Sequence, residues 1–330
     1  MAWSDIFIDA LVASIGPVAA AYALASIGLN LQFGYTGLLN VGHVAFMLTG
    51  AYGLAVTVDA GGSFWLGIVI GILVSMVLGV LLGAPTLRLR ADYLAIVTIS
   101  AGEILRLVVR SSWAEPVTNG VFGIQRFASD FFDLNPFEVN GRYGWGDFSF
   151  QGRTLWVMVV GWILVFGALG MTWRMINSPW GRALRGVRED EDAVRSLGKN
   201  VFLLKLQSLM LGGVFAGVGG MLLAVEQQSV TPDAFLPRIT FFLYVIVVLG
   251  GAGTIWGPVL GAIVFQFLFF LFDGFMRESQ AAGWYGGWLD TTGAQQVKLV
   301  LVGLGLMLLM AFRPQGFFGR RDEQLAGETR

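Results

Sequence analysis

Three charged residues share one face of an otherwise apolar segment at 93–110. Arg106 follows Glu103 by three positions and Arg110 follows it by seven, so a helix places all three on the same side. A carboxylate within a membrane span is rare and usually faces the interior of a helix bundle. Two compatible readings follow: Glu103 and Arg106 neutralise each other as a local pair, or Glu103 lines or gates a pathway.

A second polar group interrupts a long apolar stretch at 34–43. This segment contains several glycines, Asn40 and the single histidine of the chain, His43. One reading is a turn between two helices, with Asn40 capping the second. The other is a broken helix whose free N–H groups and polar side chains face a pathway, with Asn40, Gly42 and His43 exposed to it. A lone histidine is more often a packed, hydrogen-bonded residue than a proton relay.

A glycine-rich centre divides the apolar stretch 239–272. As one helix the stretch is about 50 Å long, whereas two full crossings need roughly 60 Å. A hairpin of short or half-helices is therefore expected, broken around Gly250, Gly251 and Gly253. Irregular backbone at that depth must be buried in protein or line a water-filled cavity, which is the first indication of transport.

The loop 174–205 is rich in charge. Ser178 followed by Pro179 is typical of a helix start, and apolar residues then recur at helical spacing. The pattern predicts a short amphipathic helical element that lies on the membrane or on a partner protein. Four consecutive acids at 189–192 argue against anionic lipid and favour the protein partner.

Composition places these features in a membrane. The chain has 330 residues, 55% hydrophobic and only 13% charged, whereas soluble domains carry about 25% charged residues. A soluble enzyme, a nucleic-acid-binding protein and a disordered chain are therefore excluded. The lack of cysteine excludes disulfides and thiolate sites. The sequence has no P-loop, no other catalytic motif and no metal-ligand cluster, so we expect neither enzyme activity nor a cofactor.

The elements that position these residues are membrane helices. No repeated ten-residue alternation indicates a β-barrel, so we predict an all-α polytopic membrane protein. At about 20 residues per crossing, we expect about seven full transmembrane helices plus the broken-helix hairpin, or eight to ten membrane segments. Full crossings are predicted near 10–32, 41–58, 64–85, 93–110, 154–174, 205–225 and 297–312.

Basic residues predict the orientation of these crossings. They concentrate in the loop 174–205, in the turn with Arg88 and Arg90, and in the C-terminal tail, which places all three in the cytoplasm. The N-terminus is then outside. It has no positively charged segment, so no cleaved signal peptide is expected.

The predicted organisation is one transmembrane domain over residues 1–320. It includes the cytoplasmic loop 174–205 and an acidic external loop at 111–153, and a cytoplasmic tail follows at 321–330. The external loop is open to two readings, an ordered cap or a flexible loop.

Five signatures, taken in order, give the chain a specific resemblance over roughly 20–320. It resembles the LivM-type permease subunits of bacterial ABC importers for branched-chain amino acids. The signatures are Gly34-Tyr35-Thr36-Gly37 with Asn40 to Phe46 and Gly50-Ala51-Tyr52; Leu87 to Thr98 with Gly102-Glu103-Ile104; Trp180 to Leu184 with Arg188 to Glu191; Leu249 to Thr254 with Gly257 to Ala262; and Arg313-Pro314-Gln315-Gly316.

The resemblance implies the ABC importer permease fold, a bacterial inner-membrane location and a division of labour. A periplasmic substrate-binding protein would dock outside, where 111–153 becomes the periplasmic loop. A second, LivH-like permease would complete the pathway, and two ATP-binding subunits would dock in the cytoplasm and hydrolyse ATP. Membrane lipid surrounds the assembly, and no nucleic acid takes part.

The residues have two expected roles, coupling from the resemblance and pathway lining from the broken helices and Glu103. Asp192-Ala193-Val194 with Gly198 sits at the spacing of the family's coupling helix, with Asp replacing Glu and Val replacing Ala. The expected coupling residues are Arg182, Arg188, Glu191, Asp192, Ala193 and Gly198. The expected pathway residues are Asn40, Gly42, His43, Glu103, Gly250, Gly251 and Gly253.

The substrate is less closely defined. Asn40 stands where many members have Ser, and the superfamily also includes permeases for urea, short amides and small carboxylates. Branched-chain or related small amino acids remain the expectation. A different class, a secondary transporter driven by an ion gradient, would need acids along the pathway, and only Glu103 qualifies.

Overall fold

The computed structural model describes residues 3–87, 91–138, 141–145 and 148–281, together with positions 293, 296, 297, 300, 303 and 304. Long apolar segments form helices here because a membrane leaves the backbone no other partners. The helices of 13 residues or more are α1 (Trp3–Ile15), α2 (Pro17–Leu29), α3 (Val44–Asp59), α4 (Phe64–Thr86), α5 (Ala91–Arg110), α8 (Gly152–Ile176), α11 (Val201–Gln227), α12 (Arg238–Gly250) and α13 (Gly257–Ala281).

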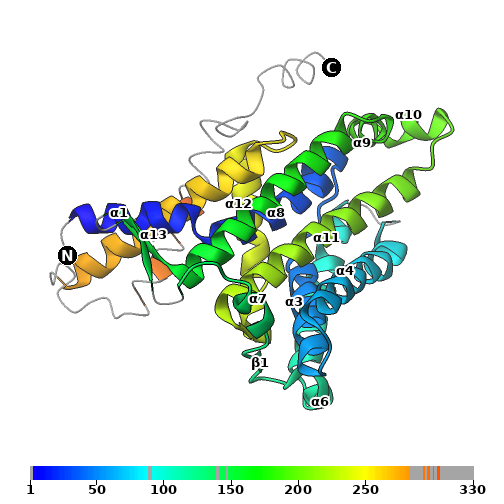
Figure 1. Cartoon of the computed structure of the whole chain (residues 1–330). Helices are drawn as coiled ribbons and strands as arrows, with labels where there is room; N and C mark the ends of the chain where they lie inside the picture. Colours follow the sequence, from blue (N-terminus) through cyan, green and yellow to red (C-terminus); the bar gives the residue numbers. More distant parts are fainter. Residues whose placement is uncertain are drawn as a thin grey trace.

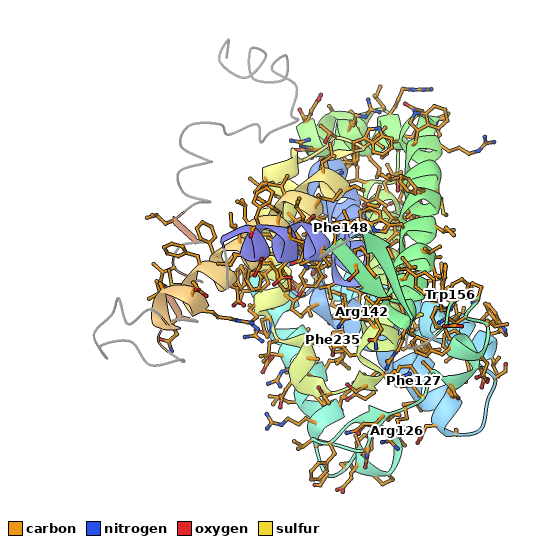
Figure 2. All side chains as sticks on the ribbon, turned by 60° about the vertical axis from the view of Figure 1, so that its left-hand side comes forward. Arg126, Phe127, Arg142, Phe148, Trp156 and Phe235 are labelled. Atoms are coloured by element: carbon orange, nitrogen blue, oxygen red, sulfur yellow. The ribbon has the colours of Figure 1, made fainter. Side chains whose placement is uncertain are left out.

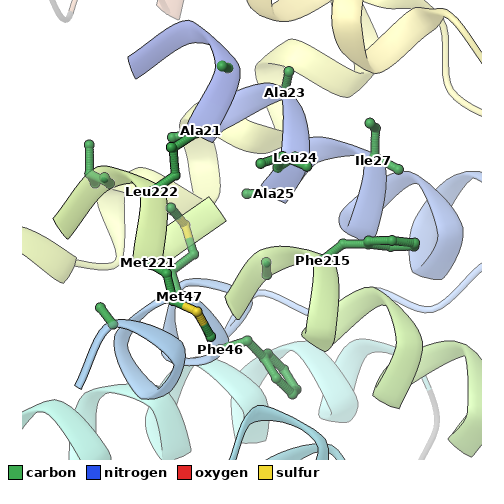
Figure 3. Close-up of a cluster of buried hydrophobic side chains, with 14 of the residues drawn as sticks. Ala21, Ala23, Leu24, Ala25, Ile27, Phe46, Met47, Phe215, Met221 and Leu222 are labelled. Carbon is green, nitrogen blue, oxygen red and sulfur yellow. The ribbon is translucent and has the colours of Figure 1, made fainter. Parts of the chain in front are cut away.

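Helix α11 lies at the centre and packs on α2, α3 and α4. Figure 3 shows the core between them, where α2 contributes Leu24, α3 contributes Phe46 and α11 contributes Phe215. Glycines allow this close packing. A Cβ at Gly212 would lie 2.5 Å from the carbonyl oxygen of Gly28, so α11 and α2 touch backbone to backbone.

The predicted first crossing, 10–32, is divided in the structure. Helices α1 and α2 meet at Gly16 with a bend of 45°. Gly16 is extended (φ −64°, ψ 174°) and Pro17 begins α2. Proline cannot continue a helix because its ring replaces the N–H and clashes with the preceding turn. A π-helix, η1 (Asn30–Tyr35), then follows α2 directly.

The predicted hairpin at 239–272 is present, with its break at 251–256. Gly251 (φ +102°) and Gly253 (φ +78°) adopt backbone conformations that favour glycine. The half-helix expectation fails for the second arm. Helix α13 continues to Ala281 and is long and apolar enough to cross a membrane.

Within the described residues, four single helices are long and apolar enough to span a membrane, namely α4, α8, α11 and α13, or five spans if the bent α1–α2 pair counts as one. A count of seven full crossings stays a prediction. Most of the predicted last crossing (297–312), the tail 321–330, Arg88 and Arg90 lie outside the described residues.

Short elements gather at both ends of the long helices. Helices α9 (Pro179–Glu189) and α10 (Glu191–Ser196) form one end, and α6 (Glu115–Thr118), α7 (Ser129–Asp133) and β1 (Ile124–Gln125) lie toward the other, as Figure 1 shows. The segment 111–153 thus holds ordered elements. Phe131 packs there against Trp156, whose Nε1 donates to the Phe131 carbonyl (3.1 Å).

Two small antiparallel sheets qualify the all-α prediction. Strand β1 pairs with β4 (Ser229–Val230), with Ile124 opposite Val230. Strands β2 (Arg142–Trp145) and β3 (Phe148–Gln151) form a hairpin, marked by Arg142 and Phe148 in Figure 2. The 3-10 helix η2 (Pro232–Phe235) follows β4.

Candidate functional site

Two helix breaks lie side by side in the structure. The first break is the segment 30–43 between α2 and α3, and the second break is 251–256 between α12 and α13. The Asn30 side chain joins them. Its Oδ1 accepts from the Gly253 N–H (2.8 Å) and its Nδ2 donates to the Thr254 carbonyl (2.8 Å). Asn30 thereby satisfies two backbone groups that the second break removes from helical pairing.

The first break begins as a π-helix, a rare form that occurs frequently at functional sites. Gly34 lies in this π-helix and directly against the second break. A Cβ on Gly34 would overlap Asn30 Oδ1 and lie 2.5 Å from the Gly253 nitrogen. Only glycine permits this spacing.

A buried polar network holds the rest of the first break. Asn40 is fully buried, and its Nδ2 donates to Gln32 Oε1 (2.9 Å) while Gln32 Nε2 donates to the Leu209 carbonyl (3.0 Å). The expectation that Asn40 caps the following helix is wrong. Its Oδ1 accepts from the Gly42 N–H (3.1 Å) within the turn. Thr240 of α12 instead accepts from the Val44 N–H (3.0 Å) at the start of α3.

Gly42 and His43 complete this break. Gly42 packs directly on the Thr98 carbonyl of α5, and a Cβ at this position would overlap the carbonyl oxygen. His43 is fully buried, with Nε2 3.0 Å from the Ala25 carbonyl oxygen. Among the described residues its Nδ1 has no hydrogen-bond partner. The local packing of His43 fits the simple reading of a hydrogen-bonded core histidine.

Glu103 forms the local pair that its spacing predicts. Arg106 donates from Nε (3.0 Å) and Nη2 (2.5 Å) to the two oxygens of Glu103. Arg106 is itself buried and also donates to Asp233 Oδ1 in η2 (2.7 Å), to which Arg110 lies at 3.3 Å. The cluster thus fixes α5 to η2. The sequence reasoning missed Asp233, which is distant along the chain.

The loop 174–205 contains two helices. Ser178 caps α9 by accepting from the Gly181 N–H, and Asp190 caps α10 by accepting from the Asp192 and Ala193 N–H groups (2.9 and 3.0 Å). Both caps follow the usual preference for Ser and Asp at this position. Val187 of α9 packs with Val194 of α10.

The predicted coupling residues differ in what they contact. Glu191 pairs with Lys205 at the start of α11, whereas Asp192 is 87% exposed and bonds Arg195 on its own helix (2.5 Å). Arg182, Ala193 and Gly198 are exposed. Leu197 is one of the apolar residues at helical spacing in the loop 174–205, yet its side chain is 79% exposed.

Arg188 connects the two predicted sites. Its Nη1 donates to the Gly34 carbonyl in the first break (2.5 Å). A Cβ placed on Gly253 would lie 3.1 Å from the same Nη1, so the structure brings this coupling residue together with Gly253 of the predicted pathway set. The residues that sequence reasoning missed here are Asn30, Gln32 and Thr240. Asn30 and Gln32 had a signal, because they are polar residues inside an apolar stretch just before Gly34.

No cluster that could hold a metal ion occurs among the residues that the structure describes. The two breaks together form one polar region between apolar helices. It can offer backbone dipoles and polar side chains at two helix breaks, beside a charged pair of helices at one end.

Comparison with known proteins identifies the family. The profile of the branched-chain amino acid transport system permease component matches residues 11–311. No solved structure matches.

Several curated relatives align over most of the chain. The LivM permease protein of Salmonella typhimurium is 34% identical over 94% of this chain and 71% of its own length. A probable LivM of Methanocaldococcus jannaschii is 25% identical over 89% of both chains. The Escherichia coli LivH permease is 24% identical over 92% of both. Together with the profile match, these alignments show that the chain belongs to the permease family of branched-chain amino acid transport systems.

Proposed function

We propose that the chain is a transmembrane permease subunit of an ATP-driven importer and forms part of the pathway for branched-chain amino acids. One observation carries the proposal: the family match spans residues 11–311, and relatives named LivM are 33–34% identical over 94% of the chain. The physical requirement agrees, since a zwitterion cannot cross hydrocarbon without a protein pathway.

The relative named LivH suggests the second permease of the proposed assembly, and the resemblance to ABC importers implies its other parts. This chain pairs with a second permease of the LivH type, two ATP-binding subunits and a periplasmic substrate-binding protein in the inner membrane. The α9–α10 end faces the cytoplasm and the ATPases, with the N-terminus outside and the C-terminus inside. The proposal places the ATPase contact at the exposed Asp192 of α10 and at Leu197, the exposed residue that directly follows this helix.

The pathway in this proposal runs at the two breaks. Asn40, Gly42 and His43 shape the first, and Gly250, Gly251 and Gly253 shape the second. All of these residues except the half-buried Gly253 are buried, so the proposal assigns the structure to a state in which the breaks are closed. Glu103 belongs to the same proposal as a residue of α5, which packs on Gly42.

A second substrate class has specific support. The nucleoside permease NupC of Lactococcus lactis is 26% identical over 72% of both chains. Identity at this level does not separate substrates, so nucleosides join urea, short amides and small carboxylates as alternatives. A thermal-shift screen of the cognate binding protein against these compounds distinguishes them, and stabilisation by leucine, isoleucine or valine alone is the expected result.

Two variants test the docking role. The first is Asp192→Lys, which reverses the exposed charge, and the second combines Asp192→Lys with Leu197→Ser. We expect both to lower substrate-stimulated ATP hydrolysis and uptake in the reconstituted complex, while binding-protein affinity is unchanged. Asp59→Lys, an exposed acid at the C-terminal end of α3, is the control for the charge change. Glu191 is unsuitable because its pair with Lys205 holds α10 to α11. Wild-type uptake in both α10 variants would overturn the docking assignment.

A further inference from the structure

One side chain from α9 reaches the junction of the two helix breaks. Arg188 Nη1 donates to the Gly34 carbonyl, and Asn30 binds the backbone of Gly253 and Thr254. A Cβ placed on Gly253 would lie 3.1 Å from Arg188 Nη1 and 3.2 Å from the Gly34 oxygen. The guanidinium therefore lies against both breaks at once.

The aliphatic part of the Arg188 side chain also contacts the first break. Gly37 has a positive φ (+74°), and a Cβ there would lie 3.3 Å from Arg188 Cγ. The side chain thus lies along the first break from Gly37 to Gly34. Among the described residues no carboxylate pairs with Arg188, so its interaction at this point is with backbone carbonyl dipoles.

Helix α10 is connected to this junction through packing. Val194 of α10 packs on Val187 of α9, the residue next to Arg188, and on Val201 at the start of α11. A Cβ on Gly186 would lie 2.9 Å from Val194 Cγ2, so the two helices are in close contact. Contiguous packed atoms therefore connect α10 to the residue next to Arg188.

We propose that Asn30 and Arg188 form a latch that holds the two breaks together, and that movement of α9 and α10 releases it during transport. The inference rests on the proposed function and deepens it, because it names how the ATPase contact reaches the pathway. Both are positioning residues, since they contact backbone and act through the breaks. Each makes only one or two hydrogen bonds to the breaks, few enough to open and reform in every cycle.

The test measures coupling in the complete reconstituted importer. Arg188→Ala and Asn30→Ala should each lower the ratio of substrate uptake to ATP hydrolysis about fivefold or more, the lower end of allosteric coupling effects. Because both hold the same junction, the double variant should lower the ratio no further than the stronger single variant. Arg188→Lys keeps a cation and most of the stem, and should restore part of the ratio.

Arg185 provides the matched control. It lies one turn earlier on α9 and donates to the Ile176 carbonyl at the end of α8 (2.9 Å), so Arg185→Ala removes the same kind of bond without touching a break. This variant should keep the wild-type ratio even if its yield falls. Equal ratios in Arg185→Ala and Arg188→Ala, or fully additive effects in the double variant, would overturn the latch.

A second readout detects opening directly. The chain has no cysteine, so Ala252→Cys in the second break creates a unique thiol. An impermeant maleimide should label it faster in the Arg188→Ala and Asn30→Ala backgrounds than in the otherwise wild-type chain. Unchanged labelling would contradict the latch. Failure of the unmodified complex to take up any substrate would instead reject the proposed function.

Discussion

Single side chains satisfy the backbone groups that the two breaks leave free. Asn30 pairs with Gly253 and Thr254, Thr240 caps the start of α3, and Arg188 binds the Gly34 carbonyl. In hydrocarbon each unpaired backbone N–H or C=O group costs several kcal/mol. One missing hydrogen-bond partner can therefore decide whether a break forms. The breaks are thus specified by a few polar residues as much as by glycine.

Gly34→Ala tests the close contact between the two breaks by adding one methyl group. The added Cβ would overlap Asn30 Oδ1 and press on the Gly253 nitrogen, so we expect a loss of about 1–3 kcal/mol in stability, typical of overpacking, seen as earlier thermal unfolding in detergent. Gly167→Ala on α8 is the control, because its Cβ would meet nothing within 4 Å. Equal unfolding temperatures in the two variants would contradict the described junction.

Residue spacing predicted the local pair of Glu103 and Arg106 because both lie on one helix. The same reasoning could not find Asp233, nor the contact between Asn30 and Thr254, which are 224 positions apart. Hydrogen bonds between distant segments depend on how the helices pack, and a single sequence does not encode that in any local pattern.

Polar side chains also join one element to another, and Arg106 joins α5 to η2. Its guanidinium bonds Glu103 and Asp233 and is only 8% exposed, whereas Glu103 is 35% exposed. Removing the Arg106 side chain takes this partner from both Glu103 and Asp233. Removing the Glu103 carboxylate leaves the pair between Arg106 and Asp233 of η2 intact.

Arg106→Ala should therefore destabilise the protein by about 1.5–3 kcal/mol, the range for hydrogen bonds to charged groups, and Glu103→Gln by clearly less. Thermal unfolding of the purified protein measures both. A Glu103→Gln variant with normal stability and reduced uptake would favour the pathway reading of Glu103. A larger loss in Glu103→Gln than in Arg106→Ala would contradict the described cluster.

Glycine-rich patterns located both breaks, because few other residues permit such close backbone approach or positive φ. Element lengths were less predictable. The split at Gly16 and Pro17 lies inside an apolar run, where hydropathy has no signal. Helix α13 runs past 272 because Asp273 stays within it and pairs with Arg277 one turn later, so a charge that ended the apolar stretch did not end the helix.

At the scale of the whole molecule, α11 packs on α2, α3 and α4 and keeps the first break at the centre. Helices α4 and α8 bury only 28% of their most apolar windows, which leaves broad apolar faces for lipid or for a partner permease. The proposed function includes separate ATP-binding subunits, which would supply energy through α9 and α10.

Uptake into proteoliposomes tests that claim most directly. The chain is reconstituted with its LivH-type partner, ATPases and binding protein, and labelled leucine uptake is followed with and without ATP. We expect uptake that needs ATP, stops with vanadate and persists when a protonophore collapses the ion gradient. Uptake by this chain alone, driven by an ion gradient and insensitive to vanadate, would contradict it.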